Sequence, residues 1–336
     1  MHAHAVTVSL ARERLVELLG RTRGKRVAVI GDAMLDVYLT GDVERISPEA
    51  PVPVVQVRNR VEALGGAANV AQNVLAIGAT CDLVATVGND PAGERVRSVL
   101  NQLGAGDASL LTIARSTTVK TRILARAQQL VRVDEEDATD LRAPDIASLL
   151  KRVRSAIAVA DAVVLEDYNK GVLVSEVIAE TMRLARERSL PVVVDPKYRN
   201  FFLYRGATIF KPNIRELEAA LGAAVDLDHS EALPATLLRL GVEHILLTLG
   251  ERGMVLFSEH GELARVPTVA RAVYDVVGAG DTVTAYLATV LAAGGTAAEA
   301  AVIANIAAGI EVGKLGAATV SGEEVIAYVD AHSLAG

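Results

Sequence analysis

The sequence predicts an α/β fold in which a mainly parallel central sheet is covered by helices on both faces and carries a small β lid. Short apolar runs that end at glycine or at polar residues recur along the chain and are typical of buried strands. Helical patterns separate most of these runs, as the crossovers of a parallel sheet require. Two segments break this alternation, and they are the reason for expecting the lid.

The expected strands and helices follow one another along most of the chain. The first strand is predicted at residues 27–31, where the sequence VAVIG ends at a glycine. The further strands are predicted at 83–87, 162–165, 192–194, 207–210 and 245–249. The helices are predicted at 7–20, 67–75, 92–103, 144–158, 174–188 and 213–221.

The expected lid consists of two inserted segments, at about 37–58 and 114–134. The first contains three closely spaced prolines, which exclude a helix or a central strand and favour an edge strand or an extended flap. In the second, apolar and polar side chains alternate with the period of a strand that has one polar face. Neither segment resembles a low-complexity linker, so we expect the whole chain, residues 1–336, to form one domain with this lid.

The composition excludes several classes of protein. The 336 residues carry 34 Lys and Arg against 41 Asp and Glu, which gives a net charge of −7. This acidic balance does not favour the basic surface of a nucleic-acid binder. Aromatic residues make up only 3% of the chain and include no Trp, so the stacking platforms of such a binder are not expected either. We therefore expect no nucleic-acid partner and no membrane partner. A single cysteine, Cys81, and the lack of an apolar block before Arg12 lead us to expect a cytoplasmic protein.

Polar side chains follow the predicted strands at the points where the strands end. In an open parallel sheet the ligand binds beyond the carboxyl ends of the strands, so these side chains are the first candidates for a functional site. They are Asp32, Asp36, Glu166, Asp167, Asp195, Lys197, Asn213, Glu216 and Thr248.

Residues 275–282 read DVVGAGDT and precede an apolar helical pattern. The free amides of the first helical turn, at Gly278, Ala279 and Gly280, form an anion site together with the positive end of the helix dipole. Asp281 lies in the same turn and is suited to act as a general base beside a bound phosphate. A first-turn acid that only stabilises the helix also explains this spacing.

A second glycine motif, GGAANVAQN, begins at Gly65 and opens another predicted helix. The bare backbone at Gly65 and Gly66 would let a ligand approach closely, and Asn69 could hydrogen-bond its hydroxyl groups. Glycines that serve only close helix packing are the alternative explanation.

The predicted lid strand carries three cations, Lys120, Arg122 and Arg126, on one face. Such a row of cations could clamp an anionic substrate. A basic face that is simply solvated is the alternative, and it is the commoner reason for such a pattern.

Several common motifs are missing. Gly31 is followed by Asp32 and Ala33, so the glycine-rich dinucleotide fingerprint is lacking after the first strand, and this disfavours a nicotinamide oxidoreductase. Residues 309–314 resemble a P-loop, but they are one residue short and lack its Ser or Thr. Neither G-x-S-x-G nor H-E-x-x-H occurs, so a serine hydrolase or a zincin has no support.

Together, the motifs resemble those of the ribokinase family of carbohydrate kinases, also called the PfkB family. The resemblance extends over about residues 27–329, and its signatures are the Gly65, Gly66 and Asn69 opening and the D-T-x-G-A-G-D element at 275–281. It implies a ribokinase-like three-layer αβα fold and an ATP-dependent transfer of phosphate to a sugar, with Asp281 as the catalytic base. Val276 replaces the usual Thr of that element, which leaves the presence of a monovalent cation open.

The resemblance also implies which residues bind the two substrates. ATP, with Mg²⁺ held through water by Glu216 and without a direct protein ligand, is expected at Asn213, Glu216, Thr248, Gly250, Gly253, Gly278, Ala279, Gly280 and Asn305. The sugar is expected at Asp32, Asp36, Gly65, Gly66, Asn69, Lys120, Arg122, Gln129 and Lys170. Arg122 and Lys170 are the favoured partners of a phosphate on the sugar.

Within the family, finer motifs resemble the branch that phosphorylates D-glycero-β-D-manno-heptose 7-phosphate at its anomeric hydroxyl, in ADP-heptose synthesis for lipopolysaccharide. They lie at 46–54, 65–73, 128–132, 167–171 and 312–320. We therefore expect heptose 7-phosphate and ATP as substrates, a stand-alone kinase without a nucleotidyltransferase segment, and a homodimer formed through the lid. A ribokinase, a fructokinase or a phosphofructokinase is the alternative enzyme, and a non-catalytic sugar-binding protein on the same fold is a further one.

Overall fold

The computed structural model describes residues 10–106, 108–125, 128–227, 233–270, 276–314 and 318–333, and these contain a mainly parallel central sheet, as the sequence predicts. Its strands are β1 Arg26–Gly31, β4 Thr80–Gly88, β5 Leu110–Ile113, β8 Ala162–Glu166, β9 Val192–Asp195, β10 Ile209–Phe210, β11 His244–Thr248, β12 Met254–Ser258 and β13 Gly261–Val266. The strand order is β13-β12-β11-β10-β9-β8-β1-β4-β5. Only β12 runs against its neighbours, β11 and β13; every other pair is parallel.

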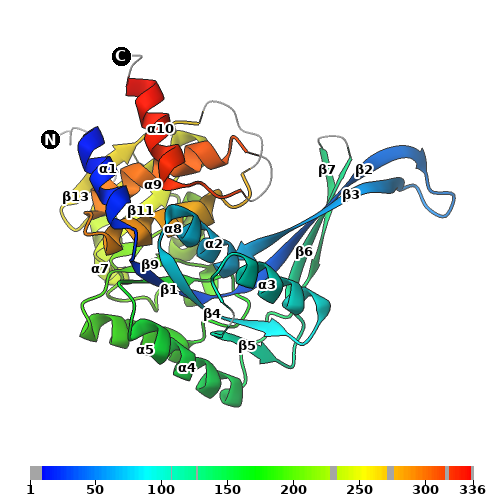
Figure 1. The fold of residues 1–336 in the computed structure, drawn as a ribbon, viewed down its shortest axis with the longest axis horizontal. Helices are drawn as coiled ribbons and strands as arrows, with labels where there is room; N and C mark the ends of the chain where they lie inside the picture. The colour runs from blue at the N-terminus through cyan, green and yellow to red at the C-terminus, as the bar shows by residue number, and fades with distance from the viewer. Residues whose placement is uncertain are drawn as a thin grey trace.

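Successive residues of the buried strands point to opposite faces of the sheet and fill two separate cores. In β1, for example, Val27 and Val29 pack into one core, whereas Ala28 and Ile30 pack into the other. The helices of the first core are α1 Arg12–Arg21, α2 Ala67–Ile77, α3 Pro91–Gln102, α8 Ala279–Ala292, α9 Ala297–Glu311 and α10 Gly322–Ser333. The helices of the second are α4 Ala143–Ile157, α5 Ser175–Glu187, α6 Ile214–Leu221 and α7 Leu233–Leu240. The result is the predicted three-layer αβα arrangement, in which α4 and α5 lie across the sheet from α8 and α2 (Figure 1).

Several predicted elements differ in extent from those observed, and β4, for example, is longer than the run at 83–87. The helix expected at 7–20 begins at Arg12, because Ala11 before it has an extended backbone; residues 1–9 lie outside the described part. The strand expected at 207–210 is limited to Ile209–Phe210, because the amide of Ala207 donates to the carbonyl of Tyr204 in a turn. Within the described residues, no helix combines the length and the apolar character that crossing a membrane would need.

A second sheet of four strands extends from the body of the molecule (Figure 1). Its strands are β2 Ala33–Ile46, β3 Pro53–Gly66, β6 Thr118–Ala125 and β7 Gln128–Glu135, in the order β3-β2-β6-β7. β2 and β3 reach beyond 37–58 at both ends, so they connect the end of β1 directly to the start of α2. Pro48 and Pro51 lie in the turn between β2 and β3, where they remove no hydrogen bond from the sheet.

Candidate active site

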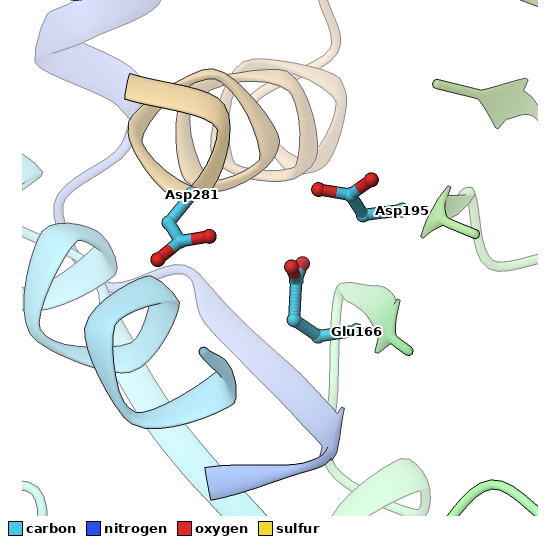
Figure 2. Close-up of side chains that lie close together, drawn as sticks. All are labelled: Glu166, Asp195 and Asp281. Atoms are coloured by element: carbon cyan, nitrogen blue, oxygen red, sulfur yellow. The ribbon is translucent and has the colours of Figure 1, made fainter. Parts of the chain in front are cut away.

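Three carboxylates converge at the carboxyl ends of the central strands. Glu166 is the last residue of β8, Asp195 is the last residue of β9, and Asp281 lies in the first turn of α8. Figure 2 shows the three side chains pointing toward one another, and a carboxylate oxygen of each lies within 4.8 Å of one from the other two. All three residues are buried, with Glu166 0% and Asp281 4% exposed. The parallel sheet therefore brings together residues that are far apart in the sequence.

Both carboxylate oxygens of Asp281 accept hydrogen bonds from side chains. The amide of Asn69 donates to Oδ2 at 2.7 Å, and the hydroxyl of Tyr168 donates to Oδ1 at 2.9 Å. Burial raises the pKa of Asp281 to about 6, the nearby charge of Asp195 adds to the rise, and the two hydrogen bonds act against it. A carboxylate whose pKa lies this close to neutrality is well matched to general-base work.

Two lysines offset part of the negative charge of this cluster. Lys211 is buried, and its ammonium lies 2.8 Å from Oδ2 of Asp195. Burial by itself would lower the pKa of Lys211, but the charges of Asp195 and Glu166 outweigh it and leave that pKa raised. Lys197 forms an ion pair with Glu216. The cluster thus combines buried acids with one buried and one partly buried cation rather than acids alone.

Glu166 is the one acid of the three whose carboxylate has no partner. Both of its oxygens are buried and form no hydrogen bond with the described residues, which is costly for a charged group. Burial raises its pKa well above the usual range, and the charges of Asp195 and Asp281 raise it further. Buried carboxylate oxygens that face one another are the kind of donor that Mg²⁺ binds, so Glu166 and Asp195 could hold a divalent cation.

The start of α8 provides an anion site beside the acids. Gly278 precedes the helix with a φ of 97°, a value that favours glycine, and Ala279 and Gly280 form the first turn. A Cβ built at Gly280 would lie 3.6 Å from the ammonium of Lys211, so that cation stands next to the free amides of the turn. The helix dipole and this lysine both favour a phosphate here. Asp275 lies outside the described residues.

Asp32 lies on the opposite side of Tyr168 from Asp281, directly after β1. Its buried carboxylate accepts backbone hydrogen bonds from Tyr168, Lys170 and Val172, at 2.8 to 3.1 Å. Burial and the charge of Asp167 raise its pKa to about 6, whereas these hydrogen bonds act to lower it. Asp32 therefore holds the loop that follows β8 in place at the site.

The second glycine motif brings the start of α2 to the same place. A Cβ at Gly66 would lie 2.4 Å from the carbonyl oxygen of Asp32, and Gly66 has a φ of 57°, so a larger residue would be strained there. A Cβ at Gly65 would lie 2.6 Å from Oδ2 of Asp36. Because the backbone at Gly65 and Gly66 packs this closely against the segment after β1, Asn69, in the first turn of α2, lies against Asp281.

The cations of the second sheet are in different environments. Arg122 forms a buried ion pair with Asp36 at 2.5 Å, so its guanidinium is already engaged by the protein. Lys120 lies 5.3 Å from the centre of the Tyr168 ring, and its pKa is lowered by burial and by the charge of Lys170. Lys170 in turn pairs with Glu136 at 2.7 Å. Gln129 is exposed on β7, and Arg126 lies outside the described residues.

The residues expected to bind the nucleotide lie on neighbouring loops. Asn213 and Glu216 form a reciprocal capping box at the start of α6, and Asn213 also forms a β-bridge with Thr248 at the end of β11. Gly250 and Gly253 lie in the turn between β11 and β12 and have positive φ angles. Asn305, on α9, donates to the carbonyl of Pro267 at 2.8 Å.

The sequence analysis assigned no role to several residues of this site. Glu166, Asp195 and Lys197 stood among the side chains at strand ends, but no motif singled them out. Tyr168 and Lys211 were missed, although each follows closely on a strand, β8 and β10 respectively. Position at or just after the end of a strand was thus a signal available for all five, and Tyr168 also lies within the motif at 167–171.

Comparison with known proteins gives concordant matches over nearly the whole chain. The pfkB family carbohydrate kinase model matches residues 25–324. Bifunctional protein HldE of Rhodospirillum rubrum is 44% identical over 318 residues, which cover 94% of this chain and 64% of that protein. Bifunctional protein HldE of Pelobacter propionicus is 45% identical over 330 residues, with 96% and 67% covered. The chain thus spans about two thirds of the length of these relatives.

Solved structures share the fold at lower sequence identity. A putative ribokinase from Agrobacterium tumefaciens has a TM-score of 0.74 at 20% identity, with 93% of this chain and 99% of that chain covered. Phosphofructokinase-2 from Escherichia coli, in complex with potassium, has a TM-score of 0.74 at 17% identity, with 91% and 99% covered. Arabidopsis thaliana ribokinase, complexed with ribose and ATP, has a TM-score of 0.71 at 19% identity, with 91% and 98% covered. These matches confirm the predicted ribokinase-like fold.

Proposed function

Because the chain belongs to the pfkB family of carbohydrate kinases and is therefore a phosphotransferase acting on a sugar hydroxyl, we propose that its substrates are ATP and D-glycero-β-D-manno-heptose 7-phosphate. The γ-phosphoryl group passes to the anomeric hydroxyl and gives heptose 1,7-bisphosphate and ADP. The observation that carries this proposal is the position of Asp281 in the first turn of α8. It lies between Asn69 and Tyr168, and the ammonium of Lys211 is near the same turn. The heptose is supported by the identity to the HldE proteins.

The proposed mechanism depends on positioning and on charge. Asp281 accepts the proton of the attacking hydroxyl as the bond to phosphorus forms, which is typically worth about 10²–10⁴-fold in rate. The amides of the first turn of α8 and the ammonium of Lys211 hold the phosphoryl oxygens as negative charge moves toward ADP. Asn69 and the backbone at Gly66 lie beside the base, where the sugar hydroxyl must enter.

The residues present fit Mg²⁺, the ion that accompanies ATP in kinases. The orphaned, buried carboxylate of Glu166 and the neighbouring carboxylate of Asp195 would hold the ion, which when bound neutralises phosphate charge. This proposal differs from the sequence-based expectation that Mg²⁺ is held only through water, by Glu216. The two oxygens of Glu216 already accept from Lys197 and from the amide of Asn213.

The phosphate of the sugar is proposed to bind at Lys120 and Lys170. The charge of Lys170 lowers the pKa of Lys120, so the two cations lie close enough to repel each other. A dianionic phosphate between them would remove that repulsion. Arg122, favoured from the sequence, is instead proposed to fix Asp36, because the two side chains form a buried pair.

A substrate panel with ATP and heptose 7-phosphate, ribose, fructose, fructose 1-phosphate and fructose 6-phosphate tests the assignment. We expect the highest kcat/KM with heptose 7-phosphate, and Lys170→Gln should raise the KM for that sugar by about 10-fold or more while leaving the KM for ATP unchanged. Lys151→Gln, which removes an exposed cation from α4, is the control and should change neither. Preference for an unphosphorylated sugar, or an unchanged sugar KM in Lys170→Gln, would contradict the proposal.

The second sheet is proposed to mediate a homodimer. Val57 and Val61 on β3 and Leu130, Val131 and Val133 on β7 are exposed, and both strands are at the edges of their sheet. Apolar edge strands left open favour uncontrolled pairing with other chains, so covering them in a dimer would remove that hazard. Light scattering at micromolar concentration should give twice the protomer mass; the mass of a single protomer would contradict this arrangement.

A further inference from the structure

Tyr168 connects the two acids that flank the candidate active site, although no motif assigns it a role. The residue follows β8 by two positions. Its backbone amide donates to Oδ2 of Asp32 at 2.8 Å, and its side-chain hydroxyl donates to Oδ1 of Asp281 at 2.9 Å. A single residue thus links the end of β1 to the first turn of α8.

The ring of Tyr168 is held by residues from three further segments. The ammonium of Lys120, on β6, lies 5.3 Å from the ring centre, and that of Lys197, in the loop after β9, lies 5.1 Å from it. A Cβ built at Gly66 would lie 3.5 Å from the ring, so the ring packs against the start of α2. These contacts leave the phenol little freedom to turn away from Asp281.

The direction of the hydrogen bond between Tyr168 and Asp281 is fixed by the two groups. A phenol hydroxyl that faces a carboxylate donates to it, because an ionised carboxylate can only accept. Asn69 donates to the other oxygen, so the two donors together fix the rotation of the Asp281 carboxylate about its Cβ–Cγ bond.

From these contacts we infer that Tyr168 is a positioning residue for Asp281: its hydroxyl orients the carboxylate that receives the proton of the sugar. The inference rests on the proposed function, because it needs Asp281 to be the base. Tyr168 acts through Asp281 and takes no proton itself. Its removal should therefore slow turnover without weakening the binding of either substrate.

The first test is Tyr168→Phe, which removes only the hydroxyl. We expect kcat to fall by about 10-fold, the gain from one hydrogen bond to a charged group, with the KM values for ATP and sugar within about twofold of the parent protein. Tyr204→Phe is the matched control, because the hydroxyl of Tyr204 donates to the carboxylate of Asp167 at 2.6 Å but does not touch the base. It should keep kcat within about twofold.

A double-mutant cycle with Asp281→Asn separates positioning from a general structural effect. If Tyr168 acts through Asp281, then Tyr168→Phe should cost almost nothing further in the Asp281→Asn background. A similar loss of kcat in both backgrounds would overturn the inference, as would full activity of the single Tyr168→Phe variant. Should Asp281→Asn itself remain fully active, the proposed function fails first, and the two failures are thus distinguished.

Discussion

Replacing Asp281 with Asn should lower kcat by about 10²–10⁴-fold, the range that general-base help typically supplies. The substitution keeps the size of the side chain, and its carbonyl oxygen can still accept a hydrogen bond from Asn69 or Tyr168. What it removes is the ability to take a proton. The change should therefore fall on turnover rather than on folding, and a coupled assay of ADP release measures it.

The control for this experiment is Asp145→Asn. Asp145 is also an acid in the first turn of a helix, α4, but it lies away from the site and pairs with Arg142. It should keep the turnover of the parent protein. Near-normal turnover in Asp281→Asn would mean that Asp281 only stabilises the start of α8, and the proposed mechanism would be wrong.

The same carboxylate should set the acid limb of the pH–rate profile. Asp281 must be deprotonated to accept a proton, and burial raises its pKa to about 6, so kcat/KM should fall as the pH drops through about 6. An Asp with an ordinary pKa would lose activity only near pH 4. Because the charge of Asp281 also raises the pKa of Glu166, the limb reports the titration of these two carboxylates together. A limb that stays near pH 4 would contradict the assignment.

The second large effect is expected from Lys211→Met, which should lower the free energy of unfolding by about 3–5 kcal/mol at pH 7. Only 4% of the Lys211 side chain is exposed, and its ammonium is the buried partner of Asp195. Methionine fills a similar volume but leaves the carboxylates of Asp195 and Glu166 without that counter-charge. A buried charge that loses its partner costs far more than a surface pair does.

The sign of the pH dependence follows from the charges. The charge of Lys211 lowers the pKa of both Glu166 and Asp281, so without it these two carboxylates are harder to ionise and bind protons more readily in the folded state. The loss of stability should therefore be smaller at pH 5 than at pH 7.5, and urea unfolding at the two pH values measures this difference. Lys151→Met, on the exposed part of α4, is the control and should change stability little at either pH. Equal losses at both pH values would contradict the role of the buried charges.

The core of the fold was predictable because strands that are buried on both faces are continuous apolar runs. β1, β4, β8, β9 and β11 all lie where such runs were found. The edge strand β5 and the terminal hairpin of β12 and β13 were missed. No helical crossover separates β11, β12 and β13 from one another, and β5, although α3 precedes it, is only four residues long.

The site was predictable only where a local motif exists. Asp281 and Asn69 lie in glycine motifs, and the structure brings them into direct contact. Tyr168 reaches Asp281 across 113 residues of chain, and periodicity carries no information about such a contact. In the same way, the sequence shows Arg122 as one of several cations on a strand, but it does not show that Asp36, on the adjacent strand, engages it.

A crystal structure with a non-hydrolysable ATP analogue and heptose 7-phosphate tests the central claim most directly. The account predicts that the γ-phosphoryl group lies against the amides of Gly278, Ala279 and Gly280, and that the anomeric hydroxyl lies within hydrogen-bond distance of Asp281. The account would be contradicted by a γ-phosphoryl group bound elsewhere, with Asp281 contacting only Asn69 and Tyr168 and no sugar hydroxyl.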